Sequence, residues 1–461
     1  MSARPYPRLF ISAVRKSSGK TLLTVGLAAA LRARGESLRL YKKGPDYIDP
    51  MWHGAASGTD ALNLDPWLMG NEACLSTFLE NSFDAGLSLI EGNLGLHDGI
   101  ELDGRYSSAD LARTLSAPIL LVVDSTGMNR NVAAVVHGMN TFDPEVRLAG
   151  VVLNNVRSSR QEQKQIAAIE QYCGLPVVGS LPGLEEAILM ERHLGLITPH
   201  EEGEFTTVVQ TMGKLIGEHI NLDRIRELAA KAPPLDAPES PAQNIPENEA
   251  GPVIAVARDP AFCFYYQQNL EALKRAGARL VFFNTLEEPS LPNADGLYIA
   301  GGFPESFLEQ LEGNASLRRE IAGKIEAGLP AYAECGGMMM LTRAIIHGGR
   351  AYEMAGVIPA EVEITRRPVG YGYVELAPGG SQSWLAVDRE IRAHEFHYSH
   401  LVNLPPETAY IYRVNRGAGI SEGRDGLIHK NLIASYAHLH ATTLPGWATD
   451  FVAAAENHRR G

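Results

Sequence analysis

A polar loop near the N-terminus carries residue types that bind the phosphates of a nucleotide. The segment AVRKSSGKT lies between an apolar run and a helical pattern, which is the strand–loop–helix setting that such a loop needs. Gly19 lets the backbone approach the phosphates, Lys20 can reach the β- and γ-phosphates, and Thr21 can ligate Mg²⁺. Together with Ser18 these residues predict an ATP site, although Val14 replaces the first glycine of the usual pattern. A chance SGKT in a surface loop is the alternative.

Acidic residues in two glycine-containing segments can complete a Mg²⁺ site. Asp46 lies in KKGPDYIDP, and Glu91 ends the apolar run of LIEGNLGLHDG. Carboxylates at strand ends suit a hard cation that bridges phosphates. We therefore expect Thr21, Asp46 and Glu91 to hold the metal, with Asp124 as the rival carboxylate because it also ends an apolar strand.

Two asparagines follow another apolar run. Asn154 and Asn155 are near the end of RLAGVVLNNV and can read the edge of an adenine, so we include Asn155 among the expected ATP-binding residues. A turn-forming pair of asparagines accounts for the same pattern equally well.

A cysteine in the C-terminal half has the surroundings of a nucleophile. PAYAECGGMMML places Cys335 between a short apolar strand and a helix, and the two glycines after it permit the sharp turn of a nucleophile elbow. The N–H of Gly336 and a second N–H from Gly302, in AGGFPE, can stabilise an oxyanion. We expect the helix N-terminus to lower the pKa of the Cys335 thiol, and His438 in SYAHLH to act as its base. An inert core cysteine is the alternative.

The composition of the whole chain is globular, with a net negative charge. The chain has 461 residues, 45% of them hydrophobic, and 41 Lys and Arg stand against 54 Asp and Glu. A formal charge of −13 disfavours non-specific binding to nucleic acid or to an anionic membrane. Four scattered cysteines fit neither a disulfide scaffold nor a zinc cluster, and they suit a reducing cytoplasm. No apolar run is long enough for a membrane span.

The elements that must position these residues form two series, one in each half of the chain. Apolar runs alternate with helical patterns, which predicts parallel sheets covered by helices on both faces. In the first half the expected strands are 8–14, 87–93, 118–124, 147–156 and 176–182, with a helix at 21–34. In the second half the expected strands are 252–259, 279–285, 296–302 and 330–337, with helices at 267–277 and 316–328 and more β-structure after about residue 350.

A segment rich in Pro, Ala and Glu separates the two series. Residues 231–251 read KAPPLDAPESPAQNIPENEAG and lack apolar periodicity, as expected of a linker. The sequence therefore predicts an α/β domain at 1–230 and a second α/β domain at 252–461.

Four parts of the chain resemble one family, the cobyrinic acid a,c-diamide synthases. They are RKSSGKT, KKGPDYIDPMWHGAASG, EGNLGLHDG and the series AECGG, HEFHYS and SYAHLH, and GPDYIDP is the most specific of them. The resemblance spans nearly the whole chain. It implies a P-loop, dethiobiotin-synthetase-like parallel sheet domain at the N-terminus and a class I glutamine amidotransferase-like domain, a glutaminase, at the C-terminus.

The resemblance also implies roles for individual residues. Lys20 and Thr21 would hold the ATP phosphates and Mg²⁺, while Cys335 would be the glutaminase nucleophile and His438 the residue that activates it. The acidic positions that serve Mg²⁺, ATP and substrate in the family correspond to Asp46, Asp49, Glu91 and Asp98.

Other positions of the resemblance have less definite roles. Within GPDYIDP and LGLHDG we expect Tyr47, Asp49 and Asp98 to contact the substrate. A standard class I glutaminase has a Glu two residues after the active histidine, but His440 occupies that position here. His394, His397 and Tyr398 match a family signature, AHEFHYS, whose role the resemblance does not define.

The implied reaction is the ATP- and glutamine-dependent amidation of the a and c acetate carboxylates of a modified tetrapyrrole, cobyrinate or hydrogenobyrinate. Sirohaem amidation in dissimilatory sulfur metabolism is an alternative, because AVRKSSGKT and DPMWHG also resemble that relative. A P-loop regulatory ATPase with a non-catalytic glutaminase-like module is an alternative from another class, and a dethiobiotin-type cyclisation is a third. We expect a cytoplasmic enzyme that uses Mg²⁺ and binds ATP, glutamine and a tetrapyrrole polycarboxylate, without nucleic acid or membrane. The sequence leaves open whether the protein forms a homodimer.

Overall fold

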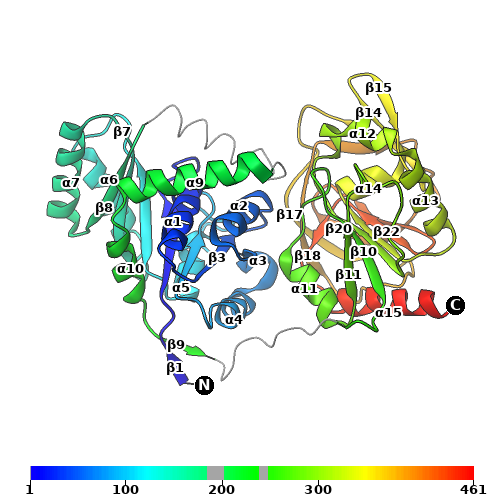
Figure 1. Cartoon of the computed structure of the whole chain (residues 1–461), viewed down its shortest axis with the longest axis horizontal. Coiled ribbons are helices and arrows are strands. Elements are labelled where there is room, and N and C mark those ends of the chain that lie inside the picture. Colours follow the sequence, from blue (N-terminus) through cyan, green and yellow to red (C-terminus); the bar gives the residue numbers. More distant parts are fainter. Residues whose placement is uncertain (1, 184–201, 238–247) are drawn as a thin grey trace. The chain divides into compact units, whose positions relative to one another are not determined.

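The computed structural model describes residues 2–183, 202–237 and 248–461, and the chain divides into two units (Figure 1). Unit 1 is Met1–Gln243 and unit 2 is Asn244–Gly461. Each unit has its own central sheet with a hydrophobic cluster on either face. The predicted fold class, two α/β domains, is confirmed.

Seven parallel strands form the sheet of unit 1, in the order β4-β3-β5-β2-β6-β7-β8. The strands are β2 (Arg8–Ala13), β3 (Leu38–Lys43), β4 (Leu62–Leu64), β5 (Leu87–Glu91), β6 (Ile119–Asp124), β7 (Leu148–Val156) and β8 (Val177–Pro182). Five of them match predicted strands. The strands β3 and β4 were not predicted, because β4 is very short and β3 ends in two lysines, which are buried in the structure.

Helices cover both faces of this sheet (Figure 1). One face is covered by α1 (Lys20–Ala33), α2 (Ile48–Ser57), α9 (Glu202–His219) and α10 (Leu222–Ala230). The other face is covered by α4 (Asn71–Asn81), α5 (Ser108–Thr114), α6 (Asn131–Thr141) and α7 (Ser159–Cys173), with the short α3 (Pro66–Met69) before α4. Burial on both faces explains why all six residues of β2 are buried and apolar periodicity is absent there.

A small second sheet lies at the end of unit 1. Its strands are β1 (Ser2–Arg4) and β9 (Leu235–Ala237), which pair antiparallel. Part of the predicted linker is therefore a strand of unit 1. Residues 238–247 of the predicted linker lie outside the described residues. The buried guanidinium of Arg8 holds the segment before β9 by donating to the carbonyl oxygen of Pro233 at 2.8 Å.

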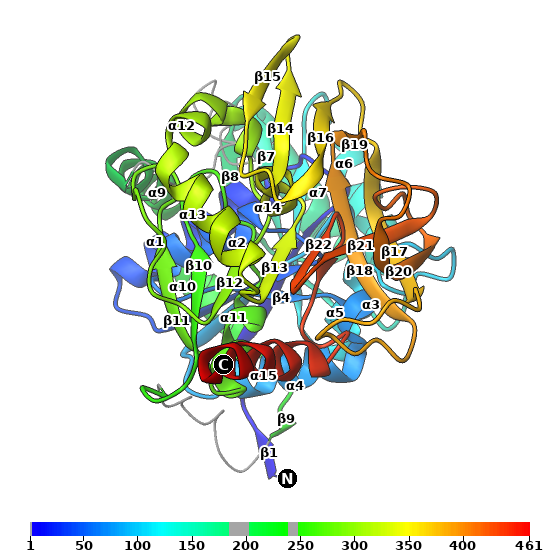
Figure 2. The same ribbon diagram turned by 90° about the vertical axis from the view of Figure 1, so that its right-hand side faces the viewer.

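Unit 2 is built on a mixed ten-stranded sheet (Figure 2). Its parallel part has the order β11-β10-β12-β13-β22 and contains β10 (Val253–Ala257), β11 (Arg279–Phe283), β12 (Gly296–Ile299), β13 (Ala331–Glu334) and β22 (Leu432–Ser435). Its antiparallel part continues with β21 (Arg424–His429), β20 (Ala409–Arg416), β17 (Gly370–Pro378), β18 (Ile391–His397) and β23 (His438–Leu439). A four-stranded sheet holds β14 (Thr342–His347), β15 (Arg350–Glu353), β16 (Ile358–Ile364) and β19 (Ser399–Val402). The β-structure predicted after about residue 350 is confirmed.

The parallel part of this sheet is covered on both faces. The helices α11 (Gln267–Arg275) and α15 (Gly446–Arg460) pack on one face. The other face carries α12 (Leu308–Gly313), α13 (Ala315–Glu326), α14 (Gly336–Leu341) and the 3₁₀ turn η1 (Pro304–Ser306). Among the described residues, no helix combines the length and the apolar character that crossing a membrane requires.

Candidate active site

The loop between β2 and α1 has a conformation that requires glycine. Gly19 has φ of +94°, in the left-handed region, and α1 begins at the next residue. The side chain of Asn154 donates to the carbonyl oxygen of Ser18 at 2.9 Å, and a Cβ on Gly19 would lie only 2.3 Å from the Asn154 Nδ2. The end of β7 therefore braces the loop, and Asn154 is a structural partner of the predicted ATP-binding residues.

The ammonium group of Lys20 lies beside the loop that follows β5. Its side chain is buried, and Nζ donates to the carbonyl oxygen of Leu94 at 2.8 Å. In the same loop Asp98 is exposed and accepts the N–H of Gly95 at 3.0 Å. The predicted phosphate-binding lysine and the predicted substrate residue Asp98 thus lie at one edge of the sheet.

Glu91 is the centre of a buried network at this edge. Its Oε1 accepts from the hydroxyl of Thr21 at 2.7 Å and from Lys42 Nζ at 2.8 Å, and its Oε2 lies 2.7 Å from His53 Nε2. Burial alone would raise the pKa of Glu91, but Lys42 and His53 hold it well below its usual range. Glu91 is therefore an ionised carboxylate in contact with the hydroxyl of Thr21.

Asp49 belongs to the same network and Asp46 lies at its border. The carboxylate of Asp49 is 2.5 Å from Lys42 Nζ and 3.4 Å from the hydroxyl of Thr21. Asp46 accepts the backbone N–H of Asp49 at 3.0 Å and so caps the first turn of α2, whose N-cap is the buried Tyr47. Burial and the neighbouring Asp46 raise the pKa of Asp49, while Lys42 opposes them. The structure thus joins Thr21 directly to Glu91 and Asp49, and it gives Asp46 a backbone partner.

The rival carboxylate, Asp124, has partners of its own. It pairs with Arg15 at 2.8 Å and accepts from the hydroxyl of Thr126 at 2.7 Å and from Asn155 Nδ2 at 3.2 Å. Asn155 itself has a left-handed backbone with φ of +60°. Asp124 and Asn155 therefore form one cluster at the end of β6 and β7.

Lys42 and His53 were not predicted as partners of Glu91. Both side chains are almost completely buried. Lys42 precedes GPDYIDP and His53 follows it, so the two residues flank the most specific motif of the chain. A buried lysine requires a counter-charge, and that requirement is the signal that could have linked Lys42 to the nearby acids.

In unit 2, Cys335 lies in a strained turn between β13 and α14. Its φ is +46° and its ψ is −105°, an unfavourable conformation for a residue with a side chain, at a cost of about 1–3 kcal/mol. The predicted sharp turn is present. A Cβ on Gly336 would lie 3.2 Å from the backbone nitrogen of Gly302, and a Cβ on Gly337 would lie 2.0 Å from the carbonyl oxygen of Ile299. Both glycines are needed for this close approach, which puts the two predicted oxyanion donors side by side.

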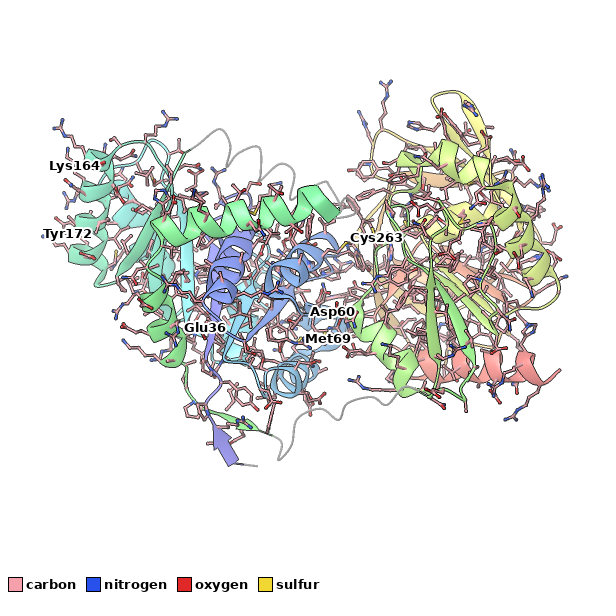
Figure 3. All side chains as sticks on the ribbon, viewed as in Figure 1. Glu36, Asp60, Met69, Lys164, Tyr172 and Cys263 are labelled. Atoms are coloured by element: carbon pink, nitrogen blue, oxygen red, sulfur yellow. The ribbon has the colours of Figure 1, made fainter. Side chains whose placement is uncertain are left out.

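The loop after β12 also contacts the predicted base. The N–H groups of Cys263, labelled in Figure 3, and Phe264 both donate to the carbonyl oxygen of Gly301 at 3.0 Å. A Cβ on Gly301 would lie 2.5 Å from Cε1 of His438, so the imidazole packs directly on this glycine. The structure therefore brings together the elbow, the oxyanion loop and His438 at the carboxyl edge of the parallel strands.

The expected low pKa of the Cys335 thiol is wrong. Burial raises its pKa, and the carboxyl groups of Glu305 and Glu334 add to the effect. The helix α14 has only six residues, so its terminus does not offset burial beside acidic groups. Burial, together with the neighbouring His394 and His397, lowers the pKa of His438 to about 3, so the imidazole is neutral and can accept a proton.

The remaining histidines have separate surroundings. His440 is buried against Tyr266, with Nδ1 at 2.8 Å from the hydroxyl of Thr442. His394 pairs with His438 across β18 and β23. His397 stacks on Tyr436 at 3.7 Å between ring centroids, whereas the nearby Tyr398 is exposed.

The acidic group beside His438 is Glu334, whose Oε2 is 3.8 Å from Nδ1 of the imidazole. Sequence reasoning missed Glu334, although an acid inside an apolar strand was a visible signal.

This fold and these two sites define a class: a P-loop nucleotide-binding domain joined to a glutamine amidotransferase domain. Residues 10–196 match the family described as the CobQ/CobB/MinD/ParA nucleotide binding domain, and residues 253–444 match the CobB/CobQ-like glutamine amidotransferase domain. The chain belongs to the cobyrinate a,c-diamide synthase family, as the resemblance predicted.

Relatives with that name match almost the full length of the chain. The cobyrinate a,c-diamide synthase of Magnetococcus marinus is 46% identical over 96% of both chains. The enzyme with that name from Methanosarcina barkeri is 37% identical over 99% of this chain and 98% of its own, and the one from Archaeoglobus fulgidus is 37% identical over 97% of each.

Proposed function

We propose that this protein uses ATP and glutamine to amidate the a and c acetate carboxylates of cobyrinate or hydrogenobyrinate. The observation that carries the proposal is the full-length similarity, at 46% identity, to a cobyrinate a,c-diamide synthase. The geometry supports it, because each unit holds one of the two sites that this reaction needs.

In unit 2 the reaction releases ammonia from glutamine. The thiolate of Cys335 attacks the side-chain amide carbon, and His438 takes the thiol proton and passes it to the departing nitrogen. Ammonia leaves, and a glutamyl thioester remains that water hydrolyses to glutamate and free thiol. The N–H groups of Gly302 and Gly336 stabilise the oxyanion that forms in both steps. Their close approach and the packing of His438 on Gly301 support these roles.

In unit 1 the substrate carboxylate is activated. A carboxylate oxygen attacks the γ-phosphorus of ATP, ADP leaves, and an acyl phosphate forms. Ammonia then attacks the acyl carbon, and inorganic phosphate departs as the amide forms. Lys20, with the loop Ser18–Thr21 and Asn155, holds the nucleotide, while Tyr47, Asp49 and Asp98 contact the tetrapyrrole substrate.

Mg²⁺ fits the residues at the start of α1. A hydroxyl and an ionised carboxylate lie in contact there, at Thr21 and Glu91, and Mg²⁺ takes its other ligands from phosphate and water. Among the described residues, no group of three or more acidic, histidine or cysteine side chains could hold a metal ion alone. Bound there, Mg²⁺ would neutralise charge on the phosphates. Asp46 is the third proposed ligand, through its place beside Asp49.

No specific observation favours the alternative functions. The relatives compared above carry the cobyrinate name, which favours neither sirohaem amidation nor a regulatory ATPase. The homodimer and the cytoplasmic location stay predictions from the sequence.

The test is to incubate the protein with ATP, Mg²⁺ and glutamine against cobyrinate, hydrogenobyrinate and sirohaem, and to weigh the products. We expect two amidations on cobyrinate or hydrogenobyrinate, with glutamate formed in step. Amidation of sirohaem alone, or glutamate release without amidation of any tetrapyrrole, would overturn the proposal.

A further inference from the structure

Glu334 connects the nucleophile strand to the base strand of unit 2. It is the last residue of β13, directly before Cys335, and its side chain is 2% exposed. Its Oε1 accepts the backbone N–H of Leu439, the residue after His438, at 2.9 Å. Its Oε2 lies 3.8 Å from His438 Nδ1. One carboxyl group therefore bonds to the backbone beside the predicted base and lies close to its imidazole.

The other neighbours of Glu334 keep its carboxyl group in place. The hydroxyl of Tyr298, on β12, donates to Oε2 at 3.1 Å, and Tyr332 on β13 is also close. Burial raises the pKa of Glu334 to about 8. The hydrogen bonds from Leu439 and Tyr298 oppose this shift, because they stabilise the ionised carboxylate.

We propose that Glu334 is the positioning residue for His438, in the place of the Glu that class I glutaminases carry two residues after the histidine. Its carboxylate holds the proton on Nδ1, so that Nε2 is the unprotonated nitrogen that accepts the thiol proton of Cys335. The 3.8 Å separation shortens to a hydrogen bond when the imidazolium forms, as catalytic contacts often do. This inference rests on the proposed glutaminase activity.

The residue at the usual position does not perform this task. His440 is hydrogen-bonded through Nδ1 to the hydroxyl of Thr442 and packs on Tyr266, so its contacts stabilise the segment in which it lies. The chain has thus moved the acid from the base strand to the residue before the nucleophile.

Substitution by glutamine tests the proposal because the amide keeps the shape. In Glu334→Gln the carbonyl oxygen can still accept from Leu439, while the NH₂ group faces His438 Nδ1 and favours the wrong tautomer. We expect the kcat for glutamate formation to fall about 10²–10⁴-fold, as for an orienting acid, with the KM for glutamine within about threefold of wild type. Amidation with added ammonia should persist, which shows that the variant is folded.

The pH dependence of Cys335 alkylation by iodoacetamide distinguishes a positioning role of Glu334 from a simple effect of its charge. The titratable groups near the thiol are Glu305, Glu334 and Asp425, and those near His438 are Glu334, His394 and His397. Removing a nearby negative charge would by itself lower the pH midpoint of alkylation. If His438 instead loses the orientation in which it accepts the thiol proton, the pH midpoint of alkylation should rise and alkylation at neutral pH should slow. This second result is the one that we expect.

Two further variants complete the experiment. Asp295→Asn is the matched control, because Asp295 accepts the N–H of Val253 at the opposite edge of the same sheet, and it should leave the midpoint unchanged. Glu334→Asp keeps the charge but withdraws the oxygens, so it should also raise the midpoint, with a smaller loss of kcat. A kcat within threefold of wild type in Glu334→Gln, or a lowered midpoint, would overturn the inference. If wild type forms no glutamate, or Cys335→Ala still does, the proposed function itself fails.

Discussion

The buried carboxylate of Glu91 shows how individual residues prepare the nucleotide site. Three donors hold it, from Thr21, Lys42 and His53, and these contacts keep it ionised in an interior that disfavours charge. A metal ion that approaches Thr21 therefore meets a carboxylate that needs no deprotonation. The motifs were sufficient to predict Thr21 and Glu91 as a pair, but the cationic partners depend on which side chains are brought together by β3, α2 and β5.

The first prediction concerns the charge of Glu91. Glu91→Gln keeps the shape and removes the charge, so it should raise the Mg²⁺ concentration needed for half-maximal amidation and reduce ATP-dependent turnover by about 10-fold or more. Glutamate formation in unit 2 should be unchanged. Asp124→Asn is the comparison, measured in the same Mg²⁺ titration. Normal Mg²⁺ dependence in Glu91→Gln, with a changed dependence in Asp124→Asn, would show that the metal is held at the end of β6.

Among the elements, the turn from β13 into α14 depends most on its glycines. The positive φ of Cys335 is stable only because Gly336 and Gly337 let the turn lie against the loop after β12. The sequence was enough to predict this strand, turn and helix, because two glycines directly after an apolar strand favour a sharp change of direction. It misled us about the thiol pKa, because the length of α14 and the acids around it depend on tertiary structure.

Substitution of the two glycines should therefore have different consequences. Gly337→Ala puts a Cβ at 2.0 Å from a carbonyl oxygen, so it should destabilise unit 2 by about 1–3 kcal/mol or more. Gly336→Ala has contacts of 3.0 Å or longer, so we expect a smaller loss of stability and a clear loss of glutamate formation. Gly323→Ala in α13, where a Cβ meets nothing within 4 Å, is the control and should be neutral or stabilising. Thermal unfolding and glutamate release measure both effects, and equal stability of the first two variants would contradict this account.

At the scale of the whole molecule, three buried histidines of unit 2 make stability sensitive to acid. Burial lowers the pKa of His394 to about 4 and that of His438 and His440 to about 3. In the unfolded chain each titrates near pH 6.5. Below that pH the unfolded state binds more protons than the native state, so stability falls as the pH falls from about 6.5 toward 4.

His440→Gln tests this dependence on one histidine that has no proposed catalytic role. The free energy of unfolding should fall less steeply with decreasing pH in this variant, by about 1.4 kcal/mol per pH unit between pH 6 and 4.5. Calorimetry over that pH range measures the slope. His429→Gln is the control, since this side chain is not fully buried and bonds to Glu326 near the surface. An unchanged slope in His440→Gln would show that His440 is already protonated in the native protein.

At the same scale, the division into two α/β domains was predictable because two alternating series flank a stretch without periodicity. The strands missed in unit 1 do not alter the sheet class. The strand β9 within the expected linker was not predictable, because its partner β1 lies at the opposite end of the sequence of unit 1.

The central claim is that nitrogen released at Cys335 is joined to a carboxylate activated at the loop of Lys20. The most direct test supplies either glutamine labelled with ¹⁵N at the side-chain amide or ¹⁵N-ammonium, with ATP, Mg²⁺ and cobyrinate, and follows the label into the product by mass spectrometry. Wild type should incorporate ¹⁵N from both sources, Cys335→Ala from ammonium only, and Lys20→Ala from neither while it still forms glutamate. Labelled product from glutamine in Cys335→Ala, or from either source at the wild-type rate in Lys20→Ala, would contradict the account.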